Sequence, residues 1–158
     1  MTLIDRTGAP TDDMWRYPQE EAELTQAPLS IVHLADWETY RSRFGEDARG
    51  VWVQGDQDVQ ALIPLLARVA VVVIEFPKSR DGRGFSLARL LRERHHYEGD
   101  IRAAGPLLPD QFSMLIQCGY TSLISPSSVP LVRWQEAATK PNVSRPRTLL
   151  DRLTQNNR

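Results

Sequence analysis

The stretch Ala70-Val71-Val72-Val73-Ile74-Glu75-Phe76 decides the fold, because it contains four consecutive β-branched residues. Such residues favour extended backbone. An unbroken apolar run, in contrast to an alternating one, is typical of a parallel strand that is covered on both faces. We therefore predict a central strand of a parallel sheet over Ala70–Phe76.

Weaker strand patterns lie on both sides of this stretch, at Leu29–Leu34, Gly50–Val53, Asp100–Ala104 and Thr121–Ile124. Helical patterns separate them, at Asp36–Phe44, Gly55–Arg68, Phe85–Arg94 and from Pro109 to Gly119. Within the second of these, Pro64 predicts a break or kink, because its ring clashes with a helical carbonyl one turn back. The alternation favours an α/β domain with a mainly parallel sheet. It leaves two arrangements open, an open doubly wound sheet and an arc resembling part of a (β/α) barrel.

The two ends of the chain are less regular. Residues 1–28 contain three prolines and several acids but little periodicity, so we expect a loosely ordered N-terminal arm that Trp15 and Tyr17 could fix to the body. Residues 29–125 are the expected single α/β domain. Residues 126–158 are a proline-containing tail, in which we expect short helices at Val132–Thr139 and Thr148–Thr154.

Charge is divided along the chain, although 158 residues carry a formal net charge of only −1. Residues 1–77 contain 6 Lys or Arg and 13 Asp or Glu, whereas residues 78–158 contain 13 and 7. The small net charge argues against a nucleic-acid or lipid partner. The basic excess comes from a block at Lys78–Arg102 and from the tail. Contact between the acidic arm and this block, or docking of an acidic partner, would each use the division.

The composition excludes several classes of protein. The single cysteine, Cys118, excludes an internal disulfide and a cysteine-based zinc or iron–sulfur site within one chain. The longest apolar run, Val69–Ile74, is far shorter than the roughly 20 residues that cross a bilayer. The beginning, MTLIDRTGAP, lacks the basic segment and apolar stretch of a signal peptide. We expect a cytoplasmic protein without a membrane partner.

A candidate site for an anion follows the central strand, because ligands of parallel α/β sheets gather at the carboxyl ends of the strands. The candidate ligand-binding residues are Glu75, Lys78, Asp81, Gly82, Arg83, Gly84, Arg102 and Gly105. Lys78, Arg80 and Arg83 precede a predicted helix, whose first N–H groups and dipole favour an anion. The loop has neither a dinucleotide-binding nor a P-loop pattern, so a solvated turn capped by Asp81 is the competing interpretation.

Other titratable residues favour structural roles. Glu75 follows the β-branched run and Arg102 lies near the end of the neighbouring predicted strand, so we expect them to form a salt bridge. Such a pair opposes a general acid–base role for Glu75. His95 and His96 are adjacent on a helix and point roughly 100° apart, so we expect helix capping and no metal site. Cys118 is expected to be a core thiol. No residue is assigned a catalytic role.

The segment from Glu75 to Arg94, EFPKSRDGRGFSLARLLRER, resembles an uncharacterised bacterial family whose members are described as probable oxidoreductases involved in sulfite reduction. The resemblance continues through Gly99–Gly105, Asp110-Gln111 and Cys118-Gly119-Tyr120, and extends loosely over most of residues 29–124. Genes of this family typically lie beside an assimilatory sulfite reductase subunit. Residues that recur in the family match Glu75, Pro77, Asp81, Gly82, Arg83, Gly84, Arg89, Arg92, Arg102 and Gly105.

The resemblance implies one of two functions. The first is a non-catalytic accessory protein of assimilatory sulfite reduction, which docks on sulfite reductase or its electron donor through charged surfaces. The second is a small enzyme or binding protein for a sulfur oxyanion or a phosphorylated ligand, held by Glu75, Lys78, Arg83 and Arg102. No flavin or nicotinamide fingerprint, and no other cofactor or metal motif, is evident in the sequence, so we favour the accessory protein. The sequence leaves open whether the protein forms a homo-oligomer.

Overall fold

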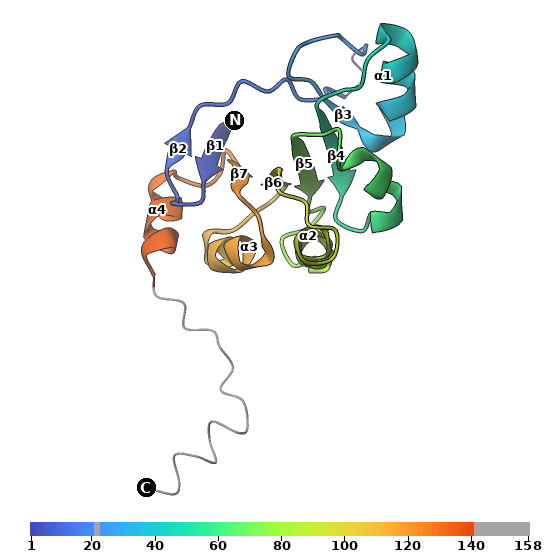
Figure 1. The fold of residues 1–158 in the computed structure, drawn as a ribbon. Helices are drawn as coiled ribbons and strands as arrows, with labels where there is room; N and C mark the ends of the chain where they lie inside the picture. The colour runs from blue at the N-terminus through green and yellow to red at the C-terminus, as the bar shows by residue number, and fades with distance from the viewer. Residues whose placement is uncertain (21–22, 141–158) are drawn as a thin grey trace, which may run out of the picture.

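The computed structural model describes residues 1–20 and 23–140, and Figure 1 shows their arrangement. The strands are β1 (Thr2–Asp5), β2 (Pro10–Thr11), β3 (Ile31–His33), β4 (Gly50–Gln54), β5 (Val71–Glu75), β6 (Asp100–Ala104) and β7 (Ser122–Ser125). The α-helices are α1 (Trp37–Phe44), α2 (Arg83–Glu93), α3 (Phe112–Cys118) and α4 (Val132–Thr139). Short 3-10 helices lie at Leu34–Asp36, Val59–Ala61, Ile63–Leu65 and Pro109–Gln111.

The strands form one seven-stranded sheet in the order β2-β1-β7-β6-β5-β4-β3. From β3 to β7 each strand is parallel to the next one in the chain, and β1 pairs antiparallel with both β7 and β2. Every parallel connection therefore moves one strand in the same direction, and right-handed crossovers then place the connecting segments on one face. The predicted α/β class is confirmed. A doubly wound sheet would reverse its order at a switch point, so the strand order is that of a singly wound arc.

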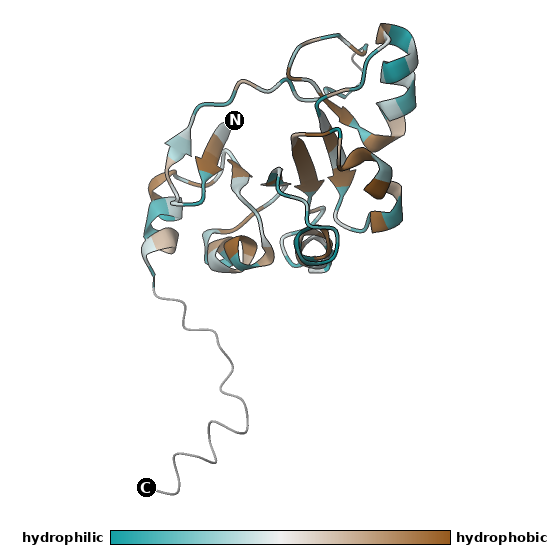
Figure 2. Cartoon of the chain, viewed as in Figure 1, coloured by the Kyte–Doolittle hydropathy of each residue, from teal (hydrophilic) through white to brown (hydrophobic). Residues whose placement is uncertain are grey.

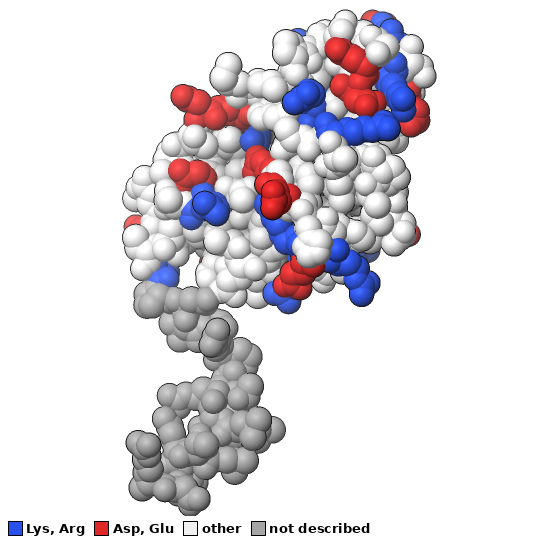
Figure 3. Space-filling model, in the orientation of Figure 1, with Lys and Arg blue, Asp and Glu red and all other residues white. Residues whose placement is uncertain are grey.

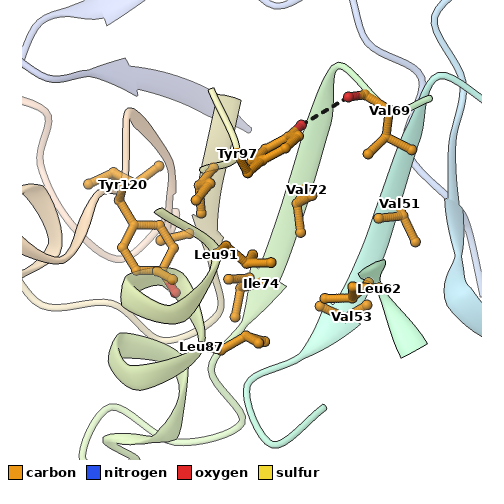
Figure 4. Packing of buried hydrophobic residues seen from close by; sticks show 14 of the residues in the cluster. Val51, Val53, Leu62, Val69, Val72, Ile74, Leu87, Leu91, Tyr97 and Tyr120 are labelled. Atoms are coloured by element: carbon orange, nitrogen blue, oxygen red, sulfur yellow. Dashed lines mark hydrogen bonds between the residues drawn. The ribbon is translucent and has the colours of Figure 1, made fainter. Parts of the chain in front are cut away.

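The main core lies between the sheet and the helices. Val72 and Ile74 of β5 point to this face and pack in one cluster with Leu87 and Leu91 of α2 (Figure 4). The Tyr97 hydroxyl donates a hydrogen bond of 3.1 Å to the Val69 carbonyl beside this cluster. The buried side chains of α2 thus cover the centre of the sheet.

The opposite face of the sheet carries a second, smaller cluster. Val71 and Val73 point to this face, where the partly buried rings of Trp15, Tyr17 and Trp52 pack against them. All four residues from Val71 to Ile74 have no exposed surface, and most of β5 is brown, hence hydrophobic, in Figure 2. Coverage of the central strand on both faces is therefore confirmed, with helices on one side and the N-terminal segment on the other.

The N-terminal segment is more ordered than its composition predicts. Thr2–Asp5 is a strand of the sheet, with Leu3 opposite Ile124 of β7, and Leu3 and Ile4 are buried. Farther along, Arg16 bridges Ser30 beside β3. The expectation of a loosely ordered arm is wrong for these residues, because a strand with only two apolar side chains leaves no periodic signal and is stabilised by its non-local partner.

Two local predictions also need correction. Gly55–Arg68 forms the short 3-10 helices at Val59–Ala61 and Ile63–Leu65 instead of an α-helix, and Pro64 lies within the second. The helix predicted over Asp36–Phe44 begins one residue later, at Trp37, and Asp36 makes no capping hydrogen bond through its side chain. In the tail, α4 matches the predicted helix at Val132–Thr139, and the helix predicted at Thr148–Thr154 lies outside the described residues.

Two glycines adapt the backbone to Phe76, which follows β5. A Cβ on Gly84 would lie 2.6 Å from the Phe76 ring. Gly105 has a φ of +105°, and a Cβ there would collide with the Phe76 carbonyl. By contrast, Gly82 has a φ of −80° and open space where a Cβ would project. Gly84 therefore lets the start of α2 pack closely against Phe76.

We expect Gly84→Ala to lower the free energy of unfolding by about 1–3 kcal/mol, because the added methyl group overpacks the contact with Phe76. Gly82→Ala is the matched control, with an expected change within about 0.5 kcal/mol for an exposed position. Urea denaturation followed by circular dichroism measures both. Equal stability of the two variants would contradict this packing role for Gly84.

Candidate functional site

An open groove of about 530 Å³ lies at the carboxyl ends of β4 to β7. Its wall includes Trp52 from β4, Glu75 from β5, Gly105 after β6 and Ile124 from β7. Leu131, which directly precedes α4, also lines the groove. Parallel α/β sheets place their ligand sites at this edge. The groove is therefore the candidate site, and it contains two of the predicted residues, Glu75 and Gly105.

The Glu75 carboxylate is held in place by two side chains of β4. Its Oε2 atom accepts hydrogen bonds from Trp52 Nε1 at 2.8 Å and Gln54 Nε2 at 2.6 Å. Oε1 accepts no hydrogen bond from the residues that the structure describes. The sequence pattern also places Gln54 at this edge, after the second predicted strand, but Trp52 was not singled out. Its spacing of two residues from Gln54 is the signal that could have placed it on the same face of the strand.

The predicted Glu75–Arg102 salt bridge is wrong. Arg102 pairs with Asp100 of its own strand, with Nη2 and Oδ2 2.8 Å apart. Its Nε atom also donates to Ser122 Oγ at 3.1 Å. Arg102 lies opposite Val73 and Glu75 lies opposite Ala104, so the two side chains share a face but not a position along the strands. Asp100 lies two residues before Arg102, so its carboxylate reaches the guanidinium on the same face.

Arg102 also fixes the N-terminal segment to the sheet. Its side chain is 4% exposed, and its Nη1 atom lies 3.3 Å from Asp13 Oδ1 and donates to the Tyr17 hydroxyl. That hydroxyl donates a hydrogen bond of 2.6 Å to Asp13. Burial raises the pKa of Tyr17, and the hydrogen bond to Asp13 raises it further. Arg102 thus joins the acidic arm to the basic block and has no free face for an anion.

The loop between β5 and α2 forms a capped turn. Arg83 Nη2 lies 2.6 Å from Asp81 Oδ2, and its Nη1 lies 3.4 Å from Asp56. Asp81 also accepts a hydrogen bond from the Arg83 backbone at 3.1 Å. These hydrogen bonds from Arg83 lower the pKa of Asp81 to about 2. The competing interpretation, a turn capped by Asp81, therefore describes this loop, and two carboxylates already face Arg83.

The other cations of the loop are exposed. Lys78 and Arg80 form no ion pair within the described residues. The predicted site is accordingly divided. Glu75 and Gly105 line the groove; Lys78, Asp81, Gly82 and Arg83 form the loop; Gly84 packs under it; and Arg102 is buried on the arm side of the sheet.

A second arginine that recurs in the family also stabilises the fold. Arg92 of α2 donates to the carbonyls of Gly119, Tyr97 and Gly99 at 2.9, 2.6 and 2.7 Å. Burial lowers the pKa of Arg92. These bonds fasten the end of α2 to the segments that precede β6 and β7. The nearby Cys118 is buried, as expected for a core thiol.

Residues 1–20 and 23–140 contain no group of three or more His, Cys, Asp or Glu side chains arranged to hold a metal ion. His95 and His96 follow the end of α2, and His96 adopts a left-handed φ of 51°. Within the same part of the chain, every helix is too short or too polar to cross a bilayer.

These features define a singly wound α/β protein with a carboxylate in the groove at the strand ends. The profile of a bacterial protein family of unknown function, DUF934, matches residues 50–145, and the chain belongs to this family. The match spans β4 to α4 and so includes the groove and the β5–α2 loop. Comparison with curated proteins and with solved structures finds no significant match.

We expect Arg102→Met to lower the free energy of unfolding by about 1.5–3 kcal/mol, because it removes the charged hydrogen bonds to the partly exposed carboxylates of Asp13 and Asp100. Arg68→Ala is the control, since Arg68 is 45% exposed and meets Asp47 at 3.4 Å. Its loss should cost no more than about 1 kcal/mol. Denaturation curves measure both, and limited proteolysis should cut residues 12–20 faster only in the Arg102 variant. Equal losses for the two variants would contradict the anchoring role.

Proposed function

We propose that this protein is an accessory protein of assimilatory sulfite reduction, which docks on sulfite reductase or its electron donor through the β5–α2 loop. The resemblance of Glu75–Arg94 to proteins described as involved in sulfite reduction supports the pathway. The exposed charges of Lys78 and Arg80 in that loop, which have no ion-pair partner among the described residues, are the observation that supports docking.

Most cations of the basic block are already used within the chain. Arg92 and Arg102 are bound internally. Arg83 faces Asp81 and Asp56, and Arg89 lies 3.8 Å from Glu93. The described residues leave Lys78, Arg80 and Arg94 without an ion pair, and the first two share one loop. Figure 3 shows basic side chains gathered around α2, with acidic ones between them.

The loop is held in one shape before any partner binds. Gln111, at the start of α3, donates a hydrogen bond to the Ser79 carbonyl. The Asp81 backbone N–H donates to the Lys78 carbonyl at 3.0 Å. A preformed loop loses less conformational entropy on binding than a disordered one. The charges of Lys78 and Arg80 are therefore presented on a fixed surface, which suits recognition of an acidic patch.

The alternative, binding of a sulfur oxyanion or a phosphorylated ligand, has less support from the geometry. It needs Glu75, Lys78, Arg83 and Arg102 around one ligand, whereas Arg102 is buried beneath the N-terminal segment and Arg83 is bound by carboxylates. The carboxylate of Glu75 would itself repel an anion in the groove.

The double variant Lys78→Ala/Arg80→Ala should bind sulfite reductase or its electron donor roughly tenfold more weakly at low salt, through lost electrostatic steering. Raising the salt concentration should weaken the parent and narrow the difference, because ions screen exposed charges. Titration calorimetry at 50 and about 300 mM salt measures this effect. Arg41→Ala/Arg68→Ala is the matched control, since it removes two exposed positive charges elsewhere and should bind like the parent. No binding of the parent at low salt, or equal loss in both double variants, would overturn the proposal.

The pathway itself is tested by growth. A strain that lacks this gene should grow slowly with sulfate as the sulfur source and normally with cysteine, because only sulfate must pass through sulfite. Complementation by the parent gene should restore growth, and complementation by Lys78→Ala/Arg80→Ala should restore it only in part. Unimpaired growth of the deletion strain on sulfate would refute a role in sulfite reduction.

A further inference from the structure

The groove at the carboxyl ends of β4 to β7 has an acidic side chain on its wall. Among the described residues that line it, Glu75 is the only one with a charged side chain. Met1, with its α-amino group, lines the groove as well but forms no ion pair with Glu75. Lys78 and Arg102 are not part of the wall, and Arg102 is paired with Asp100 and Asp13. Beside Glu75, the field therefore favours a cation and opposes an anion.

The Glu75 carboxylate is positioned so that one oxygen is open to a ligand. Trp52 and Gln54 both donate to Oε2, which fixes the plane of the carboxylate. Oε1 has no donor among residues 1–20 and 23–140. A protonated amine supplies N–H donors and a positive charge together, and charge-assisted hydrogen bonds of this kind are about twice as strong as neutral ones.

Trp52 adds an aromatic surface to the same wall. Its ring is half-buried. The ring centroid lies 6.1 Å from that of Tyr17 and 6.0 Å from that of His33, and both pairs are arranged edge to face. The hydrogen bond from its Nε1 atom to Glu75 fixes the ring beside the carboxylate. Indole is the aromatic side chain that attracts cations most strongly. An aromatic ring next to a carboxylate is a pairing suited to an ammonium ion.

The remaining wall suits an apolar body. Ile124 and Val129 line it, and Leu131 is 39% exposed at its edge. The volume of about 530 Å³ lies within the range of roughly 300–1,000 Å³ found for small-molecule sites. A ligand that combines a single positive charge with an alkyl group would meet a matching surface at both ends.

We propose that this groove binds a small organic ammonium ion, with its nitrogen at Glu75 Oε1 and Trp52 and its alkyl group against Ile124 and Leu131. The site does not depend on the docking loop, because neither Lys78 nor Arg80 lines the groove. Failure of one proposal therefore leaves the other intact.

The site is tested by titration with n-butylammonium chloride. Two-dimensional NMR spectra follow the indole N–H signals of the four tryptophans during the titration. Trp52→Phe identifies the signal of Trp52. We expect a saturable shift of that signal with n-butylammonium, and at least tenfold weaker binding of the neutral n-butanol and of the anionic butyrate. Equal binding of the ammonium ion and the alcohol, or no saturable shift, would overturn the proposal.

Glu75→Gln should weaken n-butylammonium binding at least tenfold, because it removes the charge and keeps an oxygen that can accept from Trp52. Glu98→Gln, which changes an exposed acid before β6, is the matched control and should bind like the parent. Leu131→Lys places a positive charge at the exposed edge of the groove and should also weaken binding, without altering the core. The dispersed indole signals report whether each variant is folded. Parent-like binding by folded Glu75→Gln or by Leu131→Lys would contradict the site.

Discussion

A sheet wound in one direction places all its helices on one face, so its other face needs a different cover. Here that cover is the N-terminal segment, and a buried guanidinium holds it there. Arg102 meets Asp100 on its own strand and Asp13 on the segment, 89 positions earlier in the chain. Asp100 raises the pKa of Arg102 against the lowering effect of burial. Without this neutralisation, an arginine in the middle of a sheet would be strongly unfavourable. This anchorage places Trp15 and Tyr17 against the sheet and Arg16 beside Ser30.

The same arrangement explains what local sequence patterns could and could not predict. β6 and α4 have the bounds that the patterns predict, and β5 lies within its predicted stretch, because the pattern of each lies within adjacent residues. β1 escaped prediction because it is stabilised by pairing with β7, more than a hundred residues away. The predicted partner of Arg102, Glu75, is wrong for a related reason. Glu75 ends β5 and Arg102 lies in the middle of the neighbouring β6, and register decides which side chains meet. Register is a property of the assembled sheet.

The position of the groove could be predicted from the sequence, but its charge could not. Strand alternation alone puts Glu75 and Gly105 at the carboxyl edge, where ligands of such sheets bind. The charge of the groove wall differs from the predicted one, because the cations that follow Glu75 in sequence were expected to surround the same ligand. In the structure those cations lie on a loop that Asp81 and Gln111 hold beside α2 and α3, outside the groove. The basic block and the acidic groove are neighbours in sequence and separate in function.

The residues that recur in the family have different physical roles in the structure. Gly84 and Gly105 make room for Phe76, Arg92 binds three carbonyls, and Arg102 anchors the N-terminal segment. Each of these roles needs that residue type for packing or for internal hydrogen bonding, so none of them requires a ligand. Glu75 differs, because a neutral glutamine could also accept from Trp52 Nε1, and a purely structural role does not need its charge. A carboxylate kept half-solvated at the edge where ligands bind, with one oxygen unused by the described residues, is costly to the fold alone and useful to a bound cation. That asymmetry makes Glu75 the residue through which a function of this groove would act.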